Sequence, residues 1–191
     1  MGQNVLKELL EGNKRFADET NEFPRLNKDR RLEGMNGQNP KAIVIGCADS
    51  RVPPELIFDQ GLGDLFVLRV AGNIVDEAII GSIEYAVDHL KTPLIMVLSH
   101  TNCGAVGAAI STSVEEAPGS IGSLVEAIQP AIENVRGREG DFQDNATREN
   151  ARLVAESLKS EGTIIKKAYE SNNLEIVSAY YDIETGIVSV L

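Results

Sequence analysis

Hydrophobic residues along this chain of 191 residues follow two different patterns. Short runs in which nearly every residue is apolar occur at 42–45, 65–68 and 93–99. Such runs are typical of strands that are buried on both faces of a sheet. Longer segments carry apolar residues at helical spacing instead, and they predict helices at 4–18, 77–90, 104–110, 124–135, 145–158 and 162–170.

Strands and helices alternate from the first strand onward, which predicts an α/β fold with a mostly parallel central sheet flanked by helices. The last two predicted strands, 174–179 and 187–191, are joined by the turn sequence Asp-Ile-Glu-Thr-Gly at 182–186. We therefore expect a hairpin at the C-terminal edge of the sheet. We expect a single domain, with an N-terminal helical arm at 1–35 and an α/β core at 40–191.

Composition and net charge mainly exclude certain classes of partner and location. Hydrophobic residues make up 42% of the chain but aromatic residues only 5%, so aliphatic side chains must provide most of the core. The net charge of −11 argues against sequence-independent binding to nucleic acid or to an anionic membrane, because both need a basic surface. The first residues show no secretory signal pattern, and no apolar run has the length of a membrane span. We therefore expect a cytoplasmic protein with reduced thiols and no nucleic-acid or membrane partner.

The only two cysteines and one of the two histidines follow the ends of predicted strands. Cys47 comes shortly after the first strand, and His100 and Cys103 follow the third. The carboxyl ends of parallel strands meet at one edge of a sheet, so these side chains could share one centre. Two thiolates and an imidazole favour zinc over Mg²⁺ or Ca²⁺, and three ligands leave a fourth position for chemistry. The alternative is a pair of buried structural cysteines beside a His-x-x-Cys spacing that arises by chance, although a shared centre leaves no cysteine unassigned.

Asp49 and Arg51 follow Cys47 at intervals of two residues, so all three side chains could face one pocket. Arg51 would keep Asp49 ionised and hold it in one orientation. Asp49 could take the fourth metal position, or it could accept a hydrogen bond from a water bound there. A third interpretation is an ion pair that only stiffens the loop.

These residues resemble the β-class carbonic anhydrases, and the similar segments span about 4–190 of the chain. The segments are Cys-Ala-Asp-Ser-Arg-Val-Pro-Pro at 47–54, Arg-Val-Ala-Gly-Asn at 69–73, Glu-Tyr-Ala-Val at 84–87, His-Thr-Asn-Cys-Gly-Ala-Val at 100–106, Glu-Asn at 149–150 and Ala-Tyr-Tyr-Asp-Ile-Glu-Thr-Gly at 179–186. The resemblance implies reversible hydration of CO₂ to bicarbonate and a proton. It also implies one Zn²⁺ in each subunit of a homodimer or homotetramer.

The resemblance assigns individual residues as well. It implies that Cys47, His100 and Cys103 bind zinc and that Asp49 and Arg51 are the catalytic pair. The substrate-pocket residues that it implies are Gln38, Phe66 and Gly104. It further suggests that the N-terminal arm wraps a neighbouring subunit, with the pockets at the interface.

The chain departs from the family pattern at two places. A pocket tyrosine of several members has no counterpart at 75–78. Members with a bicarbonate-inhibited state use a Trp-Arg-Tyr cluster; Arg69 matches its arginine, but the chain has no tryptophan, so we expect this regulation to be absent. Two other functions stay open: hydrolysis of carbonyl sulfide or carbon disulfide, and a non-catalytic zinc-binding assembly role with Asp49 as a permanent ligand. The presence of Arg51 and Gln38 argues against the assembly role.

Overall fold

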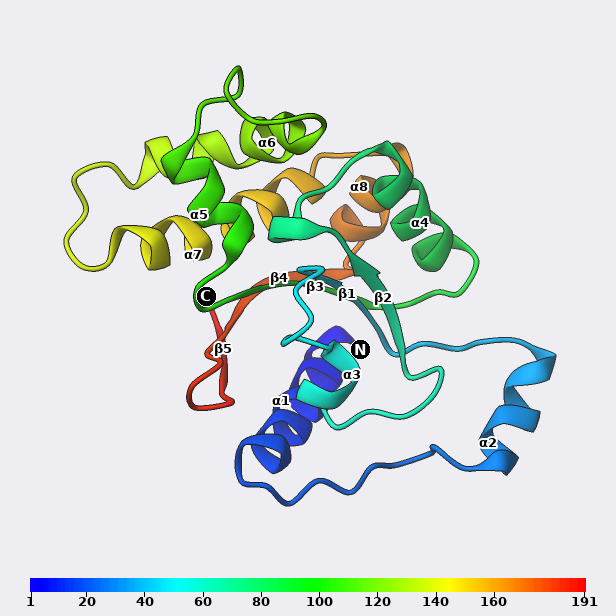
Figure 1. The fold of residues 1–191 in the computed structure, drawn as a ribbon. Coiled ribbons are helices and arrows are strands. Elements are labelled where there is room, and N and C mark those ends of the chain that lie inside the picture. The colour runs from blue at the N-terminus through cyan, green and yellow to red at the C-terminus, as the bar shows by residue number, and fades with distance from the viewer.

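The computed structural model describes residues 1–191, and its centre is a five-stranded sheet with strand order β2-β1-β3-β4-β5 (Figure 1). The strands are β1 (Ala42–Gly46), β2 (Leu65–Arg69), β3 (Leu94–His100), β4 (Glu175–Tyr181) and β5 (Val188–Val190). The first four strands run parallel, and β5 pairs antiparallel with β4. The predicted α/β fold with a mostly parallel sheet and an edge hairpin is therefore confirmed.

Helices cover both faces of the sheet (Figure 1). The helices on one face are α4 (Glu77–Asp88), α7 (Phe142–Leu158) and α8 (Thr163–Glu170), and those on the other are α1 (Gly2–Ala17) and α3 (Pro54–Ile57). Successive residues of β1 alternate between the two faces: Ile43 and Ile45 pack with the first group, and Val44 packs with the second. Because both faces are covered, β1 and β3 are buried at every position, which explains their unbroken apolar sequences.

Two further helices, α5 (Gly104–Ser111) and α6 (Ile121–Asn134), pack against each other and against α7. The sequence pattern did not predict the short elements α2 (Lys28–Glu33), α3, η1 (Gly34–Asn36) and η2 (Ala71–Asn73). These elements have three to six residues, too few for a helical period to show, and α2 buries none of its residues. None of the helices combines the length and hydropathy that a membrane span requires.

The N-terminal segment has a packed part and an exposed part. In α1, Leu9 is fully buried in the core of its own chain. The buried side chain of Asn13 donates to the carbonyl oxygens of Ile57 and Gly186 and accepts from the backbone N–H of Val188. These bonds join α1 to α3 and to the C-terminal hairpin. By contrast, α2 stands away from the body of the molecule (Figure 1).

Candidate metal centre

The neighbouring strands β1 and β3 bring Cys47, His100 and Cys103 together at their carboxyl ends. The ligand atoms of the three side chains all lie within 4.8 Å of one another, and all three residues are buried. The Sγ atoms of the two cysteines are 4.0 Å apart. A tetrahedral zinc ion with Zn–S bonds near 2.3 Å holds two sulfurs about 3.8 Å apart. The observed spacing therefore fits one shared zinc ion.

His100 presents an unpartnered ring nitrogen to this cluster. Its Nδ1 lies 2.9 Å from the carbonyl oxygen of Thr101, and a carbonyl only accepts, so Nδ1 carries the proton. Nε2 therefore keeps its lone pair, yet it is buried and has no hydrogen-bond partner in the chain. A buried polar atom without a partner is costly unless a ligand satisfies it. The bare nitrogen beside two thiols is the arrangement that a zinc ion needs.

The two cysteine sulfurs differ in their affinity for a proton. The hydrogen bond from the Cys103 thiol is the main cause that lowers the pKa of Cys47 to about 4, and the backbone N–H of Gly72 lowers it further, whereas burial opposes the shift. The same interaction, together with burial, raises the pKa of Cys103 well above its ordinary range. One sulfur therefore favours the thiolate form and the other the thiol form, and a divalent cation that bound both as thiolates would displace the remaining proton.

Asp49 and Arg51 form a bidentate pair at the edge of the centre. Arg51 donates from Nη2 to Oδ2 of Asp49 at 2.7 Å and from Nε to Oδ1 at 3.0 Å, and its backbone N–H also donates to Oδ1. The Arg51 guanidinium holds the pKa of Asp49 well below its usual range. Oδ2 of Asp49 lies 3.9 Å from Nε2 of His100, so an ionised carboxylate borders the three ligand atoms.

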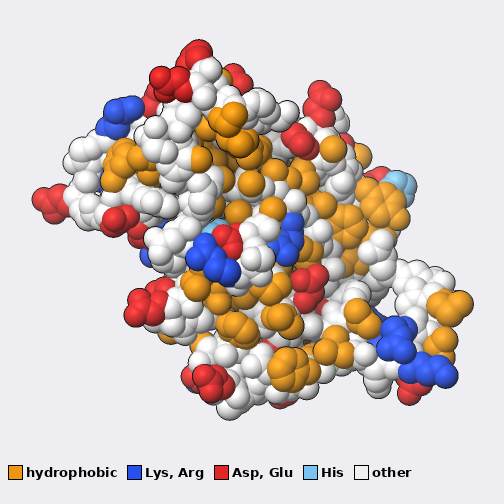
Figure 2. All heavy atoms as spheres, in the orientation of Figure 1, with side chains coloured by type: hydrophobic (Ala, Val, Ile, Leu, Met, Phe, Trp, Pro, Cys, Tyr) orange, Lys and Arg blue, Asp and Glu red, His pale blue; other side chains and the backbone are white.

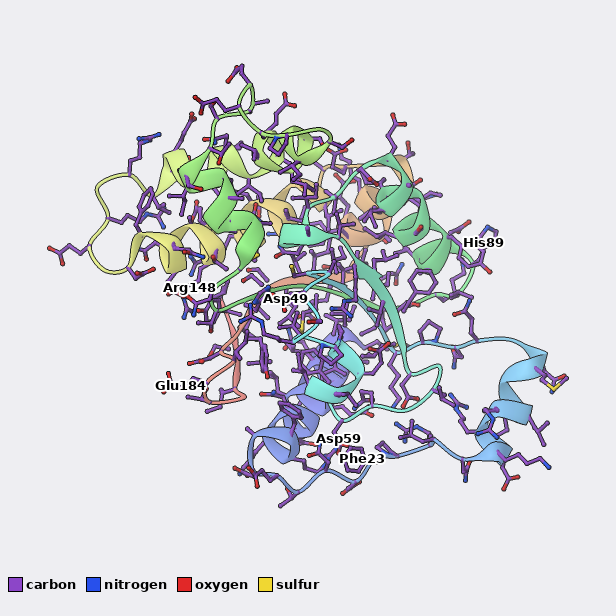
Figure 3. All side chains as sticks on the ribbon, viewed as in Figure 1. Phe23, Asp49, Asp59, His89, Arg148 and Glu184 are labelled. Carbon is purple, nitrogen blue, oxygen red and sulfur yellow. The ribbon has the colours of Figure 1, made fainter.

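Hydrophobic side chains surround this charged group on the molecular surface. Figure 2 shows acidic and basic side chains close together at the middle of one face, with hydrophobic ones around them. Figure 3 places Asp49 in the same region, near the ends of the parallel strands. A small neutral substrate would meet mostly apolar surface here, with charge only at the centre.

The structure adds contacts that the sequence did not predict. Arg69, at the end of β2, donates to the carbonyl oxygen of Cys47 at 2.9 Å and to that of Asp49. Nη2 of Arg51 also reaches the carbonyl oxygen of Asn102 at 3.3 Å, which links the two ligand-bearing loops. Asn102 has a φ of +54°, a left-handed conformation that asparagine tolerates better than most residues. These contacts use main-chain carbonyls, so no spacing of residue types could indicate them.

The three expected pocket residues lie in different surroundings. Gly104 is the first residue of α5 and directly follows Cys103. Gln38 is exposed between η1 and β1. Phe66 pairs with Ile43 in the sheet and packs on the face covered by α4, α7 and α8. The pocket role of Gln38 and Phe66 stays a prediction.

Comparisons with known proteins agree with this geometry. Residues 42–188 match the family model described as carbonic anhydrase. Carbonic anhydrase 2 of Mycobacterium tuberculosis is 39% identical over 186 residues, which cover 94% of this chain and 88% of the relative. The structure of a Coccomyxa β-carbonic anhydrase in complex with acetazolamide has a TM-score of 0.76 at 28% identity, covering 97% of this chain and 86% of that one. A tetrameric β-carbonic anhydrase from Sordaria macrospora gives 0.77 at 28% identity, with coverages of 84% and 85%.

Proposed function

Because the chain belongs to the β class of the carbonic anhydrase family, we propose that it catalyses the reversible hydration of CO₂ to bicarbonate and a proton. The observation that carries this function is the buried, unpartnered Nε2 of His100 beside two thiols. A closed structural site would not need the ionised Asp49 and its arginine at the edge of the cluster.

Cys47, His100 and Cys103 would hold one zinc ion in each subunit. Zinc bound by such ligands acts as a Lewis acid that lowers the pKa of water toward neutrality. Thiolates donate more negative charge than imidazoles and so weaken this acidity. The protein groups that hydrogen-bond to the sulfurs and to the reacting water therefore become more important.

We assign Asp49 the role of orienting the water that attacks CO₂. Both of its carboxylate oxygens accept hydrogen bonds from Arg51, so the group is ionised and fixed. An ionised carboxylate can accept a hydrogen bond but cannot donate one. The attacking water must therefore donate to Asp49, which turns a lone pair of the water toward the substrate carbon. The bidentate grip of Arg51 also opposes a swing of Asp49 onto the metal, because that movement breaks a charge-assisted pair.

A second copy of the chain would complete the substrate pocket. The Sordaria macrospora relatives are tetrameric, and this chain exposes large apolar side chains around α2 and α3. These side chains are Phe23, Leu26, Leu32, Met35, Leu56 and Leu62. We therefore favour a homodimer or homotetramer in which the exposed surface around α2 contacts a neighbouring subunit. Gln38 would then donate to a substrate oxygen from across the interface, and Phe66 would form part of the pocket wall.

The oligomeric part of the proposal can be tested by size-exclusion chromatography with light scattering at several protein concentrations. We expect a dimer or a larger even-numbered assembly at micromolar concentration. Met35→Asp, which adds a charge to the exposed surface, should shift the assembly toward monomer. Glu115→Asp, on an exposed connecting segment away from α2, is the control that should change nothing. A wild-type monomer at all concentrations would contradict the shared pocket.

The activity can be tested by stopped-flow CO₂ hydration between pH 6.5 and 9, with metal content measured on the same sample. We expect one zinc ion per chain and a rate well above that of buffer alone. Cys103→Ser should lose most of the zinc and the activity together. Full zinc occupancy in that variant would contradict the ligand assignment. A zinc-loaded wild type that turns over carbonyl sulfide but not CO₂ would instead support the hydrolase alternative.

The two thiols must be reduced to bind a metal, and we therefore propose a cytoplasmic location. Cell fractionation with alkylation of free thiols on each fraction tests this location. We expect the protein in the cytoplasmic fraction with both cysteines metal-bound or reduced. Recovery from an oxidising compartment with a Cys47–Cys103 disulfide would contradict it.

A further inference from the structure

A side chain on α7 restrains a residue whose peptide N–H donates to a ligand sulfur. The backbone N–H of Gly72 donates to Sγ of Cys47 at 3.3 Å. The carbonyl oxygen of the same glycine accepts from Nδ2 of Asn150 at 2.8 Å. Asn150 is 2% exposed, so little solvent can replace this bond.

Gly72 needs such a restraint because it lies in an unusual conformation. Its φ of +71° belongs to the left-handed region, which a glycine enters freely and leaves equally freely. A side chain would be strained at this φ, and its Cβ would also come within 2.8 Å of Cδ1 of Ile128 and 3.2 Å of Cβ of Ala105, so the position favours glycine. Glycine has no side chain that would restrain its backbone torsions, so another residue must hold Gly72 in this conformation. The carbonyl and the N–H of Gly72 belong to adjacent peptide units that are joined by the two backbone torsions of this residue. The Asn150 amide holds the first unit, and it thereby limits the rotation about these torsions that would turn the N–H away from the sulfur.

We propose that Asn150 is a positioning residue that acts through Gly72 on the Cys47 sulfur and thereby tunes the metal centre. An N–H that donates to a thiolate withdraws part of its negative charge. A sulfur with less charge donates less to the metal, which stays a stronger Lewis acid. This effect offsets the cost of using two thiolates as ligands. The inference rests on the metal centre proposed above, and Asn150 acts on it through its hydrogen bond to Gly72.

The test uses the cobalt(II)-substituted protein, because the sulfur-to-cobalt charge-transfer band reports directly on the charge of the thiolate. The variants are Asn150→Ser, which is too short to reach Gly72, and Asn150→Leu, which keeps most of the volume without a donor. Loss of the N–H···S bond should move the band to longer wavelength in both variants, with one cobalt ion still bound per chain. In the zinc forms, the pH midpoint of CO₂ hydration should rise by about half a pH unit.

A second asparagine on the same helix provides a matched control. Nδ2 of Asn145 donates to the carbonyl oxygen of Glu139 at 3.0 Å, a bond of the same kind on a loop away from the ligands. Asn145→Ser should leave both the cobalt band and the pH midpoint unchanged.

Three results would overturn the proposal. One is a folded, cobalt-loaded Asn150 variant with an unchanged band, and another is an equal shift in Asn145→Ser. The third is loss of the fold in both Asn150 variants, which would make the residue a structural one. If the wild-type protein binds no cobalt at all, the metal centre itself is wrong; if it binds cobalt with the expected band but does not hydrate CO₂, only the proposed reaction fails.

Discussion

Two aspartate–arginine pairs in this protein have the same closest distance but opposite surroundings. Asp49 and Arg51 approach to 2.7 Å, as do Asp59 and Arg15. The first pair joins residues two positions apart on one loop, and its side chains are 18% and 50% exposed. The second pair spans 44 positions, and the side chain of Asp59 is fully buried.

The partners of each aspartate explain the difference. Asp59 also accepts from the backbone N–H groups of Glu22 and Phe23, so it fixes the segment after α1 against the end of α3 (Figure 3). Asp49 holds no distant segment through its side chain and faces the ligand cluster instead. The same chemical pair therefore stabilises the fold where it is buried and long-range, and it is free to take the proposed catalytic role where it is local and borders the site. Changes to the two pairs should separate activity from stability.

Asp49→Ala should have the largest effect, and that effect should fall on activity. Removal of the carboxylate that we propose to orient the reacting water should lower kcat by about 10²-fold, while zinc stays bound. The free energy of unfolding should hardly change, because the pair is exposed and local. Stopped-flow hydration, metal analysis and urea denaturation on one preparation measure all three quantities. Asp88→Ala removes an exposed surface pair with Lys91 and is the control. Unchanged turnover in Asp49→Ala would remove this residue from the mechanism.

Asp59→Ala should have the converse effect, on stability. The change leaves Arg15 and two backbone N–H groups without their acceptor, which should lower the free energy of unfolding by about 2 kcal/mol. The kcat of the folded enzyme should stay within about twofold of wild type, since the residue does not reach the centre. Urea denaturation at a fixed protein concentration measures the first quantity, because assembly also contributes to apparent stability. A large loss of kcat in fully folded Asp59→Ala would erase the distinction between the pairs.

Arg51→Lys should have a smaller effect on activity than loss of Asp49. Lysine keeps the positive charge but cannot grip both carboxylate oxygens in one plane, so Asp49 becomes less well oriented. We expect kcat to fall by about 10-fold with zinc retained. Arg136→Lys, at an exposed position shortly after α6, is the matched control. Full activity in Arg51→Lys would show that charge alone is sufficient.

The smallest expected effect is on the pH dependence of the free energy of unfolding, to which Asp59 should contribute. Burial favours the neutral form of Asp59, but the hydrogen bonds from Glu22, Arg15 and Phe23 outweigh it and lower the pKa of the carboxyl. A lowered folded-state pKa stabilises the fold fully above the ordinary aspartate pKa of about 3.9, and this stabilisation is lost as pH falls through the folded-state value. Urea midpoints of wild type and Asp59→Asn should therefore differ near pH 6 and converge toward pH 2. Parallel curves would show that Asp59 contributes no such linkage.

The sequence predicts those parts of the molecule in which the type of a side chain reflects its place in the fold. The apolar runs of β1 and β3 and the ligands that follow them are of this kind, since burial and strand ends leave a direct mark on the sequence. The contacts of Arg69 and Asn150 with main-chain carbonyls leave no mark on the sequence, because every residue offers the same carbonyl acceptor. The link between Asp59 and Arg15 is equally hidden, since it joins distant segments through a single pair of side chains.

The contacts of Asn13 set an order of events during synthesis. Its side chain binds the backbone of Gly186 and Val188, which lie 173 and 175 residues further along the chain. The helix α1 is therefore synthesised long before its polar partners, and a nascent chain cannot complete this contact until Val188 has left the ribosome. Deletion of the hairpin formed by β4 and β5 should therefore weaken the attachment of α1, although the two segments are far apart in the sequence.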